Sequence, residues 1–303
     1  MSGRAGFVAL FGWTNVGKST LLNRLLGEKI AAVADVPQTT RTRILGALPL
    51  GDNAERGQIV FVDTPGMHEP KHAMNRAMVD TAHRALEGID LALLLVDAAH
   101  GPGEGDRRSA QVLERAGVAR LGVLNKIDRV RPKTKLLPML DEVKTWGIEE
   151  WIPVSALTGE GCDLLVEEVS KRLPEGPTPF PPDFLTDQPE RALAAEWIRE
   201  KILHHTRQEI PHASAVSVDS WKEREDGLLE VEATILVERE GQKGIVIGKG
   251  GALLKQIGTE ARADLERFFQ AKVMLRLWVK VREEWRDDRG ALRELGIEGD
   301  RHQ

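Results

Sequence analysis

The stretch Gly12–Ser19, which reads Gly-Trp-Thr-Asn-Val-Gly-Lys-Ser, constrains this chain more than any other. It follows the apolar run Phe7–Phe11, which predicts a buried strand, and it opens residues 18–27, whose apolar positions recur at helical spacing. The pattern G-x-x-x-x-G-K-S between a strand and a helix is typical of a phosphate-binding loop. Its glycines let backbone N–H groups form a concave nest, and the helix adds the positive end of its dipole. The alternative is a glycine-rich turn that happens to contain Lys-Ser. Such a turn would not explain the predicted strand before it or the predicted helix after it.

Length and composition set the broad class. A chain of 303 residues suits two domains, and 41% hydrophobic with 29% charged residues indicates a globular protein. The net charge of −5 gives no whole-chain sign of nucleic-acid binding, so any basic surface must be local. The single Cys162 excludes an internal disulfide and is expected in the core. No apolar run approaches the roughly 20 residues needed to cross a bilayer, and the N-terminus lacks a signal-peptide core, so we expect a cytoplasmic protein.

Residues 1–174 alternate short apolar runs with helical patterns, which predicts a mostly parallel sheet wrapped by helices. Only Ile44–Leu50 and Ile59–Val62 lack a helix between them, so they should form one antiparallel hairpin at the edge of that sheet. The expected strands are Phe7–Phe11, Ile44–Leu50, Ile59–Val62, Leu91–Val96, Leu121–Leu124 and Trp151–Val154, and the expected helices lie near 18–27, 72–88, 104–117, 135–146 and 162–173.

A proline-rich linker, residues 175–189, follows this α/β domain. Residues 190–303 show a different order and predict an α+β domain: a helix (190–207), two strands (213–221 and 228–238), a glycine-rich loop between helices (243–269), a strand (272–282) and a charged helical tail. We expect the aromatic residues Phe268, Phe269 and Trp278 in its core.

Polar residues at the carboxyl ends of the predicted strands should gather around a phosphate ligand. Lys18, expected to face solvent until phosphate binds, should reach the β- and γ-phosphates, and the Ser19 hydroxyl should ligate Mg²⁺. Asp63 should hold the same ion through water, with Thr40 as the second hydroxyl, and the Gly66 N–H should meet the γ-phosphate. Taken alone, Asp-Thr-Pro-Gly (63–66) is a common turn, and residues 37–43 could be a solvated polar loop.

A second group of residues indicates a purine reader. The carboxylate of Asp128, in Asn125-Lys126-Ile127-Asp128, can accept from both the ring N–H and the amino group of guanine, a pair that adenine does not offer. Lys126 should lie along the base, Asn125 should tie this loop to the phosphate loop, and the backbone of Ser155–Leu157 should face the guanine oxygen. Alone, the tetrapeptide is an ordinary helix start.

The order and spacing of these motifs resemble those of translation-factor-class GTPases. Together with Gln38-Thr39-Thr40-Arg41 and the second domain, they resemble the Era family of ribosome-assembly GTPases over nearly the whole chain. The resemblance implies GTP hydrolysis as a timing switch, in which the γ-phosphate orders residues near 35–43 and 64–75.

The chain departs from that family at Trp13-Thr14, where Arg-Pro usually stands. Met67 occupies the position at which many small GTPases carry a water-positioning glutamine, so no general base is named. Asn15 matches an asparagine that holds K⁺ against the phosphates in related GTPases. The alternative is that Asn15 only shapes the loop.

The loop Gly248-Lys249-Gly250-Gly251 between two predicted helices has the G-x-x-G pattern with which KH domains clamp the backbone of single-stranded nucleic acid. The alternative is a helix–turn–helix with glycine for packing. Residues 242–258 and 267–282 contain basic residues and no acid, which suggests one basic face. The element order resembles the type II KH fold, and the family implies the 3′ end of 16S ribosomal RNA and the small ribosomal subunit as partners.

The sequence therefore predicts a GTP- and GDP-binding P-loop GTPase domain followed by a type II KH domain, acting as a small-subunit assembly factor. We expect a monomer, and peripheral association with the inner face of the cell membrane stays open. A GTPase for tRNA modification or ion transport would leave the G-x-x-G loop unexplained, and an RNA-binding protein with a degenerate nucleotide site would not release phosphate.

The predicted nucleotide-binding residues are Gly12, Trp13, Thr14, Asn15, Val16, Gly17, Lys18, Ser19, Thr20, Asp63, Thr64, Pro65, Gly66, Met67, Asn125, Lys126, Asp128, Ser155, Ala156 and Leu157. Lys18, Asn15 and Thr40 are predicted to support the transition state, and Ser19, Thr40 and Asp63 to hold the metal. The predicted RNA-binding residues are Lys243, Ile247, Gly248, Lys249, Gly250, Gly251, Lys255, Arg276 and Lys280.

Overall fold

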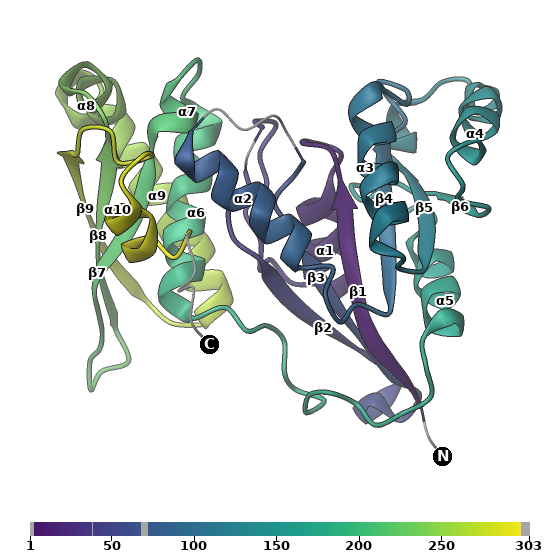
Figure 1. Cartoon of the computed structure of the whole chain (residues 1–303). Helices are drawn as coiled ribbons and strands as arrows, with labels where there is room; N and C mark the ends of the chain where they lie inside the picture. The colour runs from purple at the N-terminus through teal and green to yellow at the C-terminus, as the bar shows by residue number, and fades with distance from the viewer. Residues whose placement is uncertain (1–2, 38, 68–71, 298–303) are drawn as a thin grey trace. The chain divides into compact units, whose positions relative to one another are not determined.

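The computed structural model describes residues 3–37, 39–67 and 72–297 (Figure 1). These residues form two compact units, one of residues 3–30, 40–67 and 78–187, the other of residues 31–37, 39, 72–77 and 188–297. Gln38 of the family motif, part of the 64–75 segment and the end of the predicted helical tail lie outside the described residues.

The first unit is built on a six-stranded sheet with the strand order β2-β3-β1-β4-β5-β6. Only β2 is antiparallel, pairing with β3 in the register Ile44↔Asp63 to Leu50↔Gly57, so the predicted edge hairpin is confirmed. The strands are β1 (Arg4–Gly12), β2 (Ile44–Leu50), β3 (Gly57–Asp63), β4 (Leu91–Asp97), β5 (Arg120–Asn125) and β6 (Trp151–Pro153).

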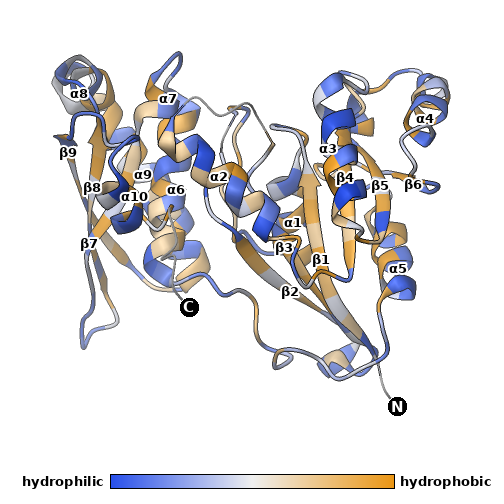
Figure 2. Ribbon diagram, in the orientation of Figure 1, coloured by the Kyte–Doolittle hydropathy of each residue, from blue (hydrophilic) through white to orange (hydrophobic). Residues whose placement is uncertain are grey.

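Helices cover the sheet, and the described strands β3 and β4 are buried along their whole length, which explains why they are almost continuously apolar. Figure 2 shows this contrast between hydrophobic strands and helices with hydrophilic outer faces. Cys162 is buried, as expected. The helices are α1 (Lys18–Leu26), α2 (Ala73–Arg84), α3 (Glu104–Ala116), α4 (Leu136–Lys144) and α5 (Cys162–Arg172).

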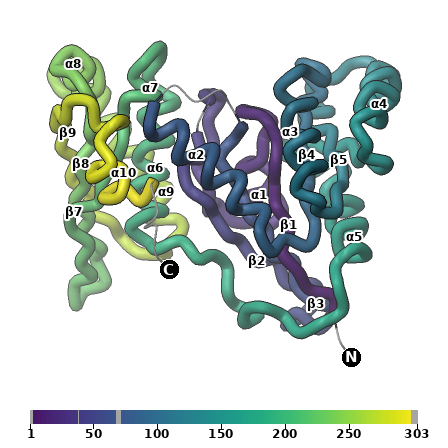
Figure 3. Tube along the Cα trace, in the orientation of Figure 1, coloured from purple at the N-terminus to yellow at the C-terminus, as the bar shows by residue number. Residues whose placement is uncertain are grey.

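The proline-rich segment after α5 is fastened to the first unit along most of its length. It starts beside the beginning of β1, where the Ala5 N–H donates to the Pro174 carbonyl over 3.0 Å (Figure 3). The buried Gln58 amide then donates to the Phe180 carbonyl and accepts from its N–H. Phe180 stacks on Phe184 with centroids 4.2 Å apart, over an apolar patch of β2 and β3. The segment thus behaves as an ordered strap.

The second unit carries a three-stranded sheet, β7-β8-β9, in which β8 is antiparallel to β7 and parallel to β9. The order helix–strand–strand–helix–helix–strand confirms the predicted type II KH arrangement. Its elements are α6 (Glu190–His205), α7 (Ile210–Ala213), β7 (Ala215–Glu223), β8 (Leu229–Val237), α8 (Glu240–Ile247), α9 (Ala252–Phe269), β9 (Val273–Val281) and α10 (Arg289–Glu294).

One expected core residue of this unit is on the surface. The rings of Phe268 and Phe269 lie 5.1 Å apart and pack against Trp197. Trp278, however, is 43% exposed, so its assignment to the core is wrong. Strand alternation explains the difference: Leu277 and Val279 on either side of it take the buried face.

Two short segments belong to the second unit although they border the predicted nucleotide site in the sequence. One precedes the predicted metal ligand Thr40, and the other follows the Asp-Thr-Pro-Gly turn. The Val33 N–H donates to Glu200 of α6 over 2.8 Å, and the Thr39 carbonyl accepts from Arg199. The Ala73 N–H donates to Asp287 over 2.8 Å. These stretches overlap the ranges that the family resemblance assigns to the γ-phosphate response.

Candidate nucleotide site and RNA-binding loop

The phosphate loop requires its glycines. Gly17 has a φ of +95°, and a Cβ there would lie 2.3 Å from the Asn125 side-chain nitrogen. Gly12 has a φ of +148°, and a Cβ there would lie 2.6 Å from the Leu95 carbonyl oxygen. Gly17 also has no side chain, so α1 begins without a side-chain cap, and the N–H groups of its first turn can serve as donors to an anion.

Lys18 lies inside this loop. Its ammonium group donates to the carbonyls of Gly12 (3.2 Å) and Trp13 (2.9 Å), and the residue is only 6% exposed. The expectation that Lys18 faces solvent is therefore wrong. Burial lowers the pKa of Lys18 to about 8, although the negative charges of Asp63 and Asp106 oppose the change. A phosphate group would satisfy the charge that the loop carbonyls only partly compensate.

The three predicted metal ligands converge. The Ser19 hydroxyl lies 2.6 Å from the Asp63 carboxylate and 2.6 Å from the Thr40 hydroxyl, and Thr40 lies 3.4 Å from the same carboxylate oxygen. Burial raises the pKa of Asp63 to about 6, against the opposing effect of Lys18. The other oxygen of Asp63 is buried without a hydrogen-bond partner among the described residues. One carboxylate and two hydroxyls with an unsatisfied oxygen suit Mg²⁺, which prefers oxygen ligands.

The turn after β3 lies against the phosphate loop. A Cβ at Gly66 would meet the Thr14 Cα at 2.9 Å and the Lys18 ammonium at 3.2 Å. The Met67 N–H donates to the Gly12 carbonyl over 3.2 Å, while the Thr64 hydroxyl is turned inward to the Leu10 carbonyl. Gly66 and Met67 of this turn therefore border the phosphate loop.

The predicted base-reading residues form one network at the ends of β5 and β6. Asn125 donates to the Val16 carbonyl (2.9 Å) and accepts from the Ala156 N–H (3.0 Å), so it joins two loops to the phosphate loop. Lys126 donates to the Asn15 carbonyl over 2.6 Å. The Ser155 hydroxyl donates to Asp128 over 2.6 Å and orients that carboxylate.

The sequence reasoning missed two supports of this network. Asp97 accepts from Lys126 over 2.8 Å; although burial pushes the pKa of Asp97 upward, hydrogen bonds from Lys126 and His100 hold it below its usual value. Asp97 directly follows the apolar run of β4, a signal that could have identified it. Arg24 of α1 donates to the carbonyls of Ala156 and Leu157, and nothing in its sequence context indicates this.

Trp13, at the position of the family departure, packs against the start of α3. A Cβ at Gly105 would lie 2.4 Å from the indole ring, so the ring lies directly on this glycine. The neighbouring Asp106 caps α3 through the Gly103 N–H over 3.0 Å, and its second oxygen is buried without a hydrogen-bond partner among the described residues.

The G-x-x-G loop of the second unit is open. Gly248, Gly250 and Gly251 have φ angles of +75°, +60° and +79°, and nothing lies within 4 Å of a Cβ built at Gly250 or Gly251. Lys249 is exposed, and α9 begins directly after the loop without a side-chain cap. A phosphate could approach the backbone here as closely as the sequence predicts. Lys243, Ile247 and Lys255 flank the loop on α8 and α9.

Two predicted RNA-binding residues lie elsewhere. Arg276 and Lys280 alternate with Leu275, Leu277, Val279 and Val281, which pack in the core with α8 and α9. They therefore point to the opposite face of the sheet, where Arg276 pairs with Glu232 of β8 at 3.0 Å. The single basic face expected from the sequence is divided between two faces.

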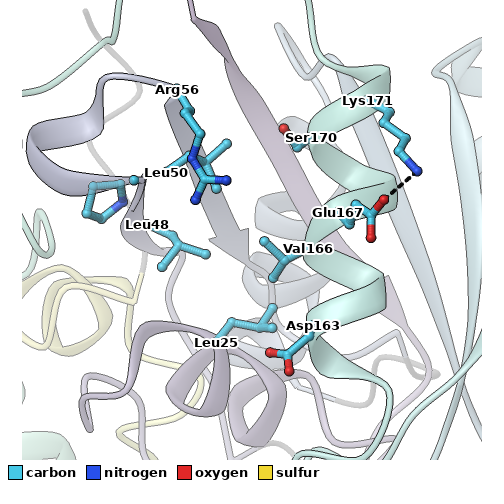
Figure 4. A pocket seen from close by; sticks show the side chains of 11 residues that line it. Leu25, Leu48, Leu50, Arg56, Asp163, Val166, Glu167, Ser170 and Lys171 are labelled. Carbon is cyan, nitrogen blue, oxygen red and sulfur yellow. Dashed lines mark ion pairs between the residues drawn. The ribbon is translucent and has the colours of Figure 1, made fainter.

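A separate cavity of about 620 Å³ lies in the first unit between α1, α5 and the end of β2. Figure 4 shows Arg56 above apolar residues that include Leu48 and Val166, with the Glu167–Lys171 ion pair on the rim. None of the predicted nucleotide-binding residues lines it.

Within the described part of the chain, no helix is both long and apolar enough to span a membrane.

The fold and the site define the class: a P-loop GTPase domain with a guanine-reading motif, joined to a KH domain. Residues 7–126 match the family described as "50S ribosome-binding GTPase", and residues 209–286 match the KH domain. The chain is 50% identical to GTPase Era of Geobacter metallireducens, over 97% of both chains, and 50% identical to that of Syntrophus aciditrophicus, over 97% of this chain and 95% of the relative. It belongs to the Era family of GTPases.

Solved structures support the assignment to this family. A crystal structure of Era in complex with MgGDPNP and nucleotides 1506–1542 of 16S ribosomal RNA superposes with a TM-score of 0.94 at 40% identity, covering 97% of this chain and 99% of that one. A variant of Aquifex aeolicus Era bound to GDP and aluminium fluoride gives 0.93 at 40% identity with the same coverage. The predicted fold class and the GTPase activity are confirmed.

Proposed function

We propose that this GTPase binds the 3′ end of 16S ribosomal RNA and acts as an assembly factor of the small ribosomal subunit. The observation that carries the proposal is the coexistence, in one chain, of a convergent Ser19–Thr40–Asp63 site and an open G-x-x-G loop. The Era structure in complex with that ribosomal RNA segment supports it.

The phosphate loop and the Asn125–Asp128 loop divide the recognition of GTP between them. Lys18 supplies the positive charge for the phosphates from inside the loop. Asp128, oriented by Ser155, accepts hydrogen bonds from guanine, and the loop around Ala156 is held in place by Asn125 and Arg24. Adenine would leave the Asp128 carboxylate unpaired, so selectivity follows from hydrogen-bond satisfaction.

We assign Mg²⁺ to Ser19, Thr40 and Asp63, because their oxygen atoms converge and Asp63 retains an unsatisfied buried oxygen. When bound, the ion supplies positive charge that neutralises the phosphate oxygens. It would also favour the ionised form of Asp63, whose pKa burial otherwise raises to about 6.

Hydrolysis in this chain relies on charge and positioning. The Met67 thioether cannot orient a water molecule by a strong hydrogen bond. Asn15, which has a φ of +61° in the loop, remains our candidate for holding K⁺ near the phosphates. The monomeric state, cytoplasmic location and peripheral membrane association also remain predictions.

The experiment measures phosphate release and RNA affinity in the same preparations. The parent should release phosphate from GTP and not from ATP, and Lys18→Ala should abolish release. Gly250→Asp should abolish binding of a single-stranded RNA with the 16S 3′ sequence and leave hydrolysis unchanged. A carboxylate about 4 Å from a phosphate is repelled by on the order of 1 kcal/mol in water, and more when desolvated.

Gly250 has a φ of +60°, so Gly250→Asn, which tolerates this conformation better than most residues and is uncharged, is the matched control for backbone strain. The variants are first shown to be folded by their thermal transitions. Parental RNA affinity and salt dependence in folded Gly250→Asp would refute the RNA assignment, whereas phosphate release by Lys18→Ala at the parental rate would refute the phosphate loop.

A further inference from the structure

The segment that leaves Thr40 is fastened to the end of the proline-rich strap, entirely within the first unit. Thr40 reaches Ser19 and Asp63, and the chain enters β2 only four residues later, at Ile44. The C-terminal anchor of the Thr40 segment is therefore the beginning of β2.

Asp187 holds this beginning with both carboxylate oxygens. One oxygen accepts the Leu45 N–H over 3.1 Å, and the other pairs with the Arg43 guanidinium at 3.2 Å. The preceding Thr186 hydroxyl donates to the Leu45 carbonyl over 2.6 Å. Residues 186–187 thus bind two of the five residues that follow Thr40.

Protection of a strand edge explains only part of this arrangement. β2 is the edge strand of its sheet, and the strap covers it through the Gly46↔Thr186 bridge and the hydrogen bond from the Ala47 N–H to the Leu185 carbonyl, 2.9 Å long. Those backbone contacts suffice to blunt the edge. The Asp187 carboxylate adds contacts nearer to Thr40, at Leu45 and Arg43.

We propose that Asp187 is a positioning residue of the GTPase site, which fixes the start of β2 and so holds Thr40 where its hydroxyl can ligate Mg²⁺. The inference rests on the metal role proposed for Thr40. Without Asp187 the Thr40 segment samples more conformations, and the apparent affinity for the ion falls by the fraction of molecules in which Thr40 is in place.

The two contacts of Asp187 differ in strength, so substitutions that remove one or both of them should differ in effect. The Arg43 and Asp187 side chains are 49% and 31% exposed, so their ion pair contributes little. The hydrogen bond to the Leu45 N–H is partly buried and contributes more. Asp187→Asn keeps an oxygen acceptor for this N–H, so it should retain most of the effect that Asp187→Ala loses.

The test is single-turnover GTP hydrolysis by the full chain as a function of Mg²⁺ concentration. Asp187→Ala should raise the half-saturating Mg²⁺ concentration about threefold to tenfold, and Asp187→Asn by about twofold or less. Asp183→Asn, an exposed acid on the same strap, is the matched control and should equal the parent. GDP affinity without Mg²⁺, which depends on the phosphate loop, should change in none of them.

Thr40→Ala, measured in parallel, distinguishes the positioning role of Asp187 from the metal-binding role of Thr40. If it shifts the Mg²⁺ dependence and Asp187→Ala does not, the positioning role is overturned and the proposed metal site stands. If Thr40→Ala has no effect either, the metal role of Thr40 fails, and the positioning role fails with it. Should Asp187→Ala not fold, Thr186→Val, which removes the bond to the Leu45 carbonyl, is judged by the same criterion.

Discussion

Asn125 offers the sharpest test of how the nucleotide site is assembled. The residue is 2% exposed, and its side chain donates to the Val16 carbonyl and accepts from the Ala156 N–H. Asn125→Ala would leave both buried groups without a partner, at a cost of about 1–3 kcal/mol each. We therefore expect the free energy of unfolding of the nucleotide-free protein to fall by roughly 2–4 kcal/mol, with some relief from water entering the space.

Urea denaturation of the nucleotide-free protein measures the free energy of unfolding, and calorimetric titration of the folded protein measures its affinity for GTP. Asn125→Asp keeps the acceptor for Ala156 but places a carboxylate oxygen against the Val16 carbonyl, so it should destabilise at least as much as alanine. Asp128→Asn leaves both hydrogen bonds intact and should weaken GTP binding with little change in stability. A loss of less than about 1 kcal/mol for Asn125→Ala would refute the view that this side chain holds the loops together.

Three further predictions concern the same site. Asp128→Asn should shift specificity from guanine to xanthine nucleotides, and unchanged GTP affinity would exclude Asp128 as the base reader. K⁺ should accelerate phosphate release relative to Na⁺, and Asn15→Ala should remove the difference; equal rates of the parent in both salts would leave Asn15 a structural residue. Burial raises the pKa of Asp106 to about 6. The folded state therefore binds more protons than the unfolded state between about pH 4 and 6, and Asp106 should lower stability by up to about 3 kcal/mol as the pH rises through this range. Asp106→Asn should flatten that slope in urea titrations, and an unaltered slope would contradict the assignment.

The fold and most of the site could be predicted because their signals are local. The strand before Gly12, the helix after it and the runs that end at Asp63 and Asn125 are each visible in a short window, and parallel strands bring their carboxyl ends to one edge. The convergence of Ser19 and Asp63 follows from that geometry.

The faces of single residues were harder to predict. The burial of Lys18 depends on how tightly the loop closes around its ammonium group, which no motif specifies. Trp278 looked like a core residue because aromatic residues usually are, yet strand alternation places it with Arg276 and Lys280 on the outer face. Composition over 267–282 suggested one basic surface, because a count along the chain does not distinguish the two faces of a strand.

The surroundings of the Trp13 side chain could not be predicted from the sequence, because they depend on how the chain folds. On its own, tryptophan in a phosphate loop suggests a bulky group near the nucleotide. In the structure the indole lies on Gly105, at the start of α3, where a Cβ would come within 2.4 Å of the ring. The Trp13 backbone still pairs with that of Met67 across the site, and its carbonyl still accepts from Lys18. The loop therefore keeps its backbone geometry. The large Trp13 side chain fits because Gly105, more than ninety positions later in the chain, has no side chain. Trp13 and Gly105 form a matched pair, and a change at either position has to be judged with the other.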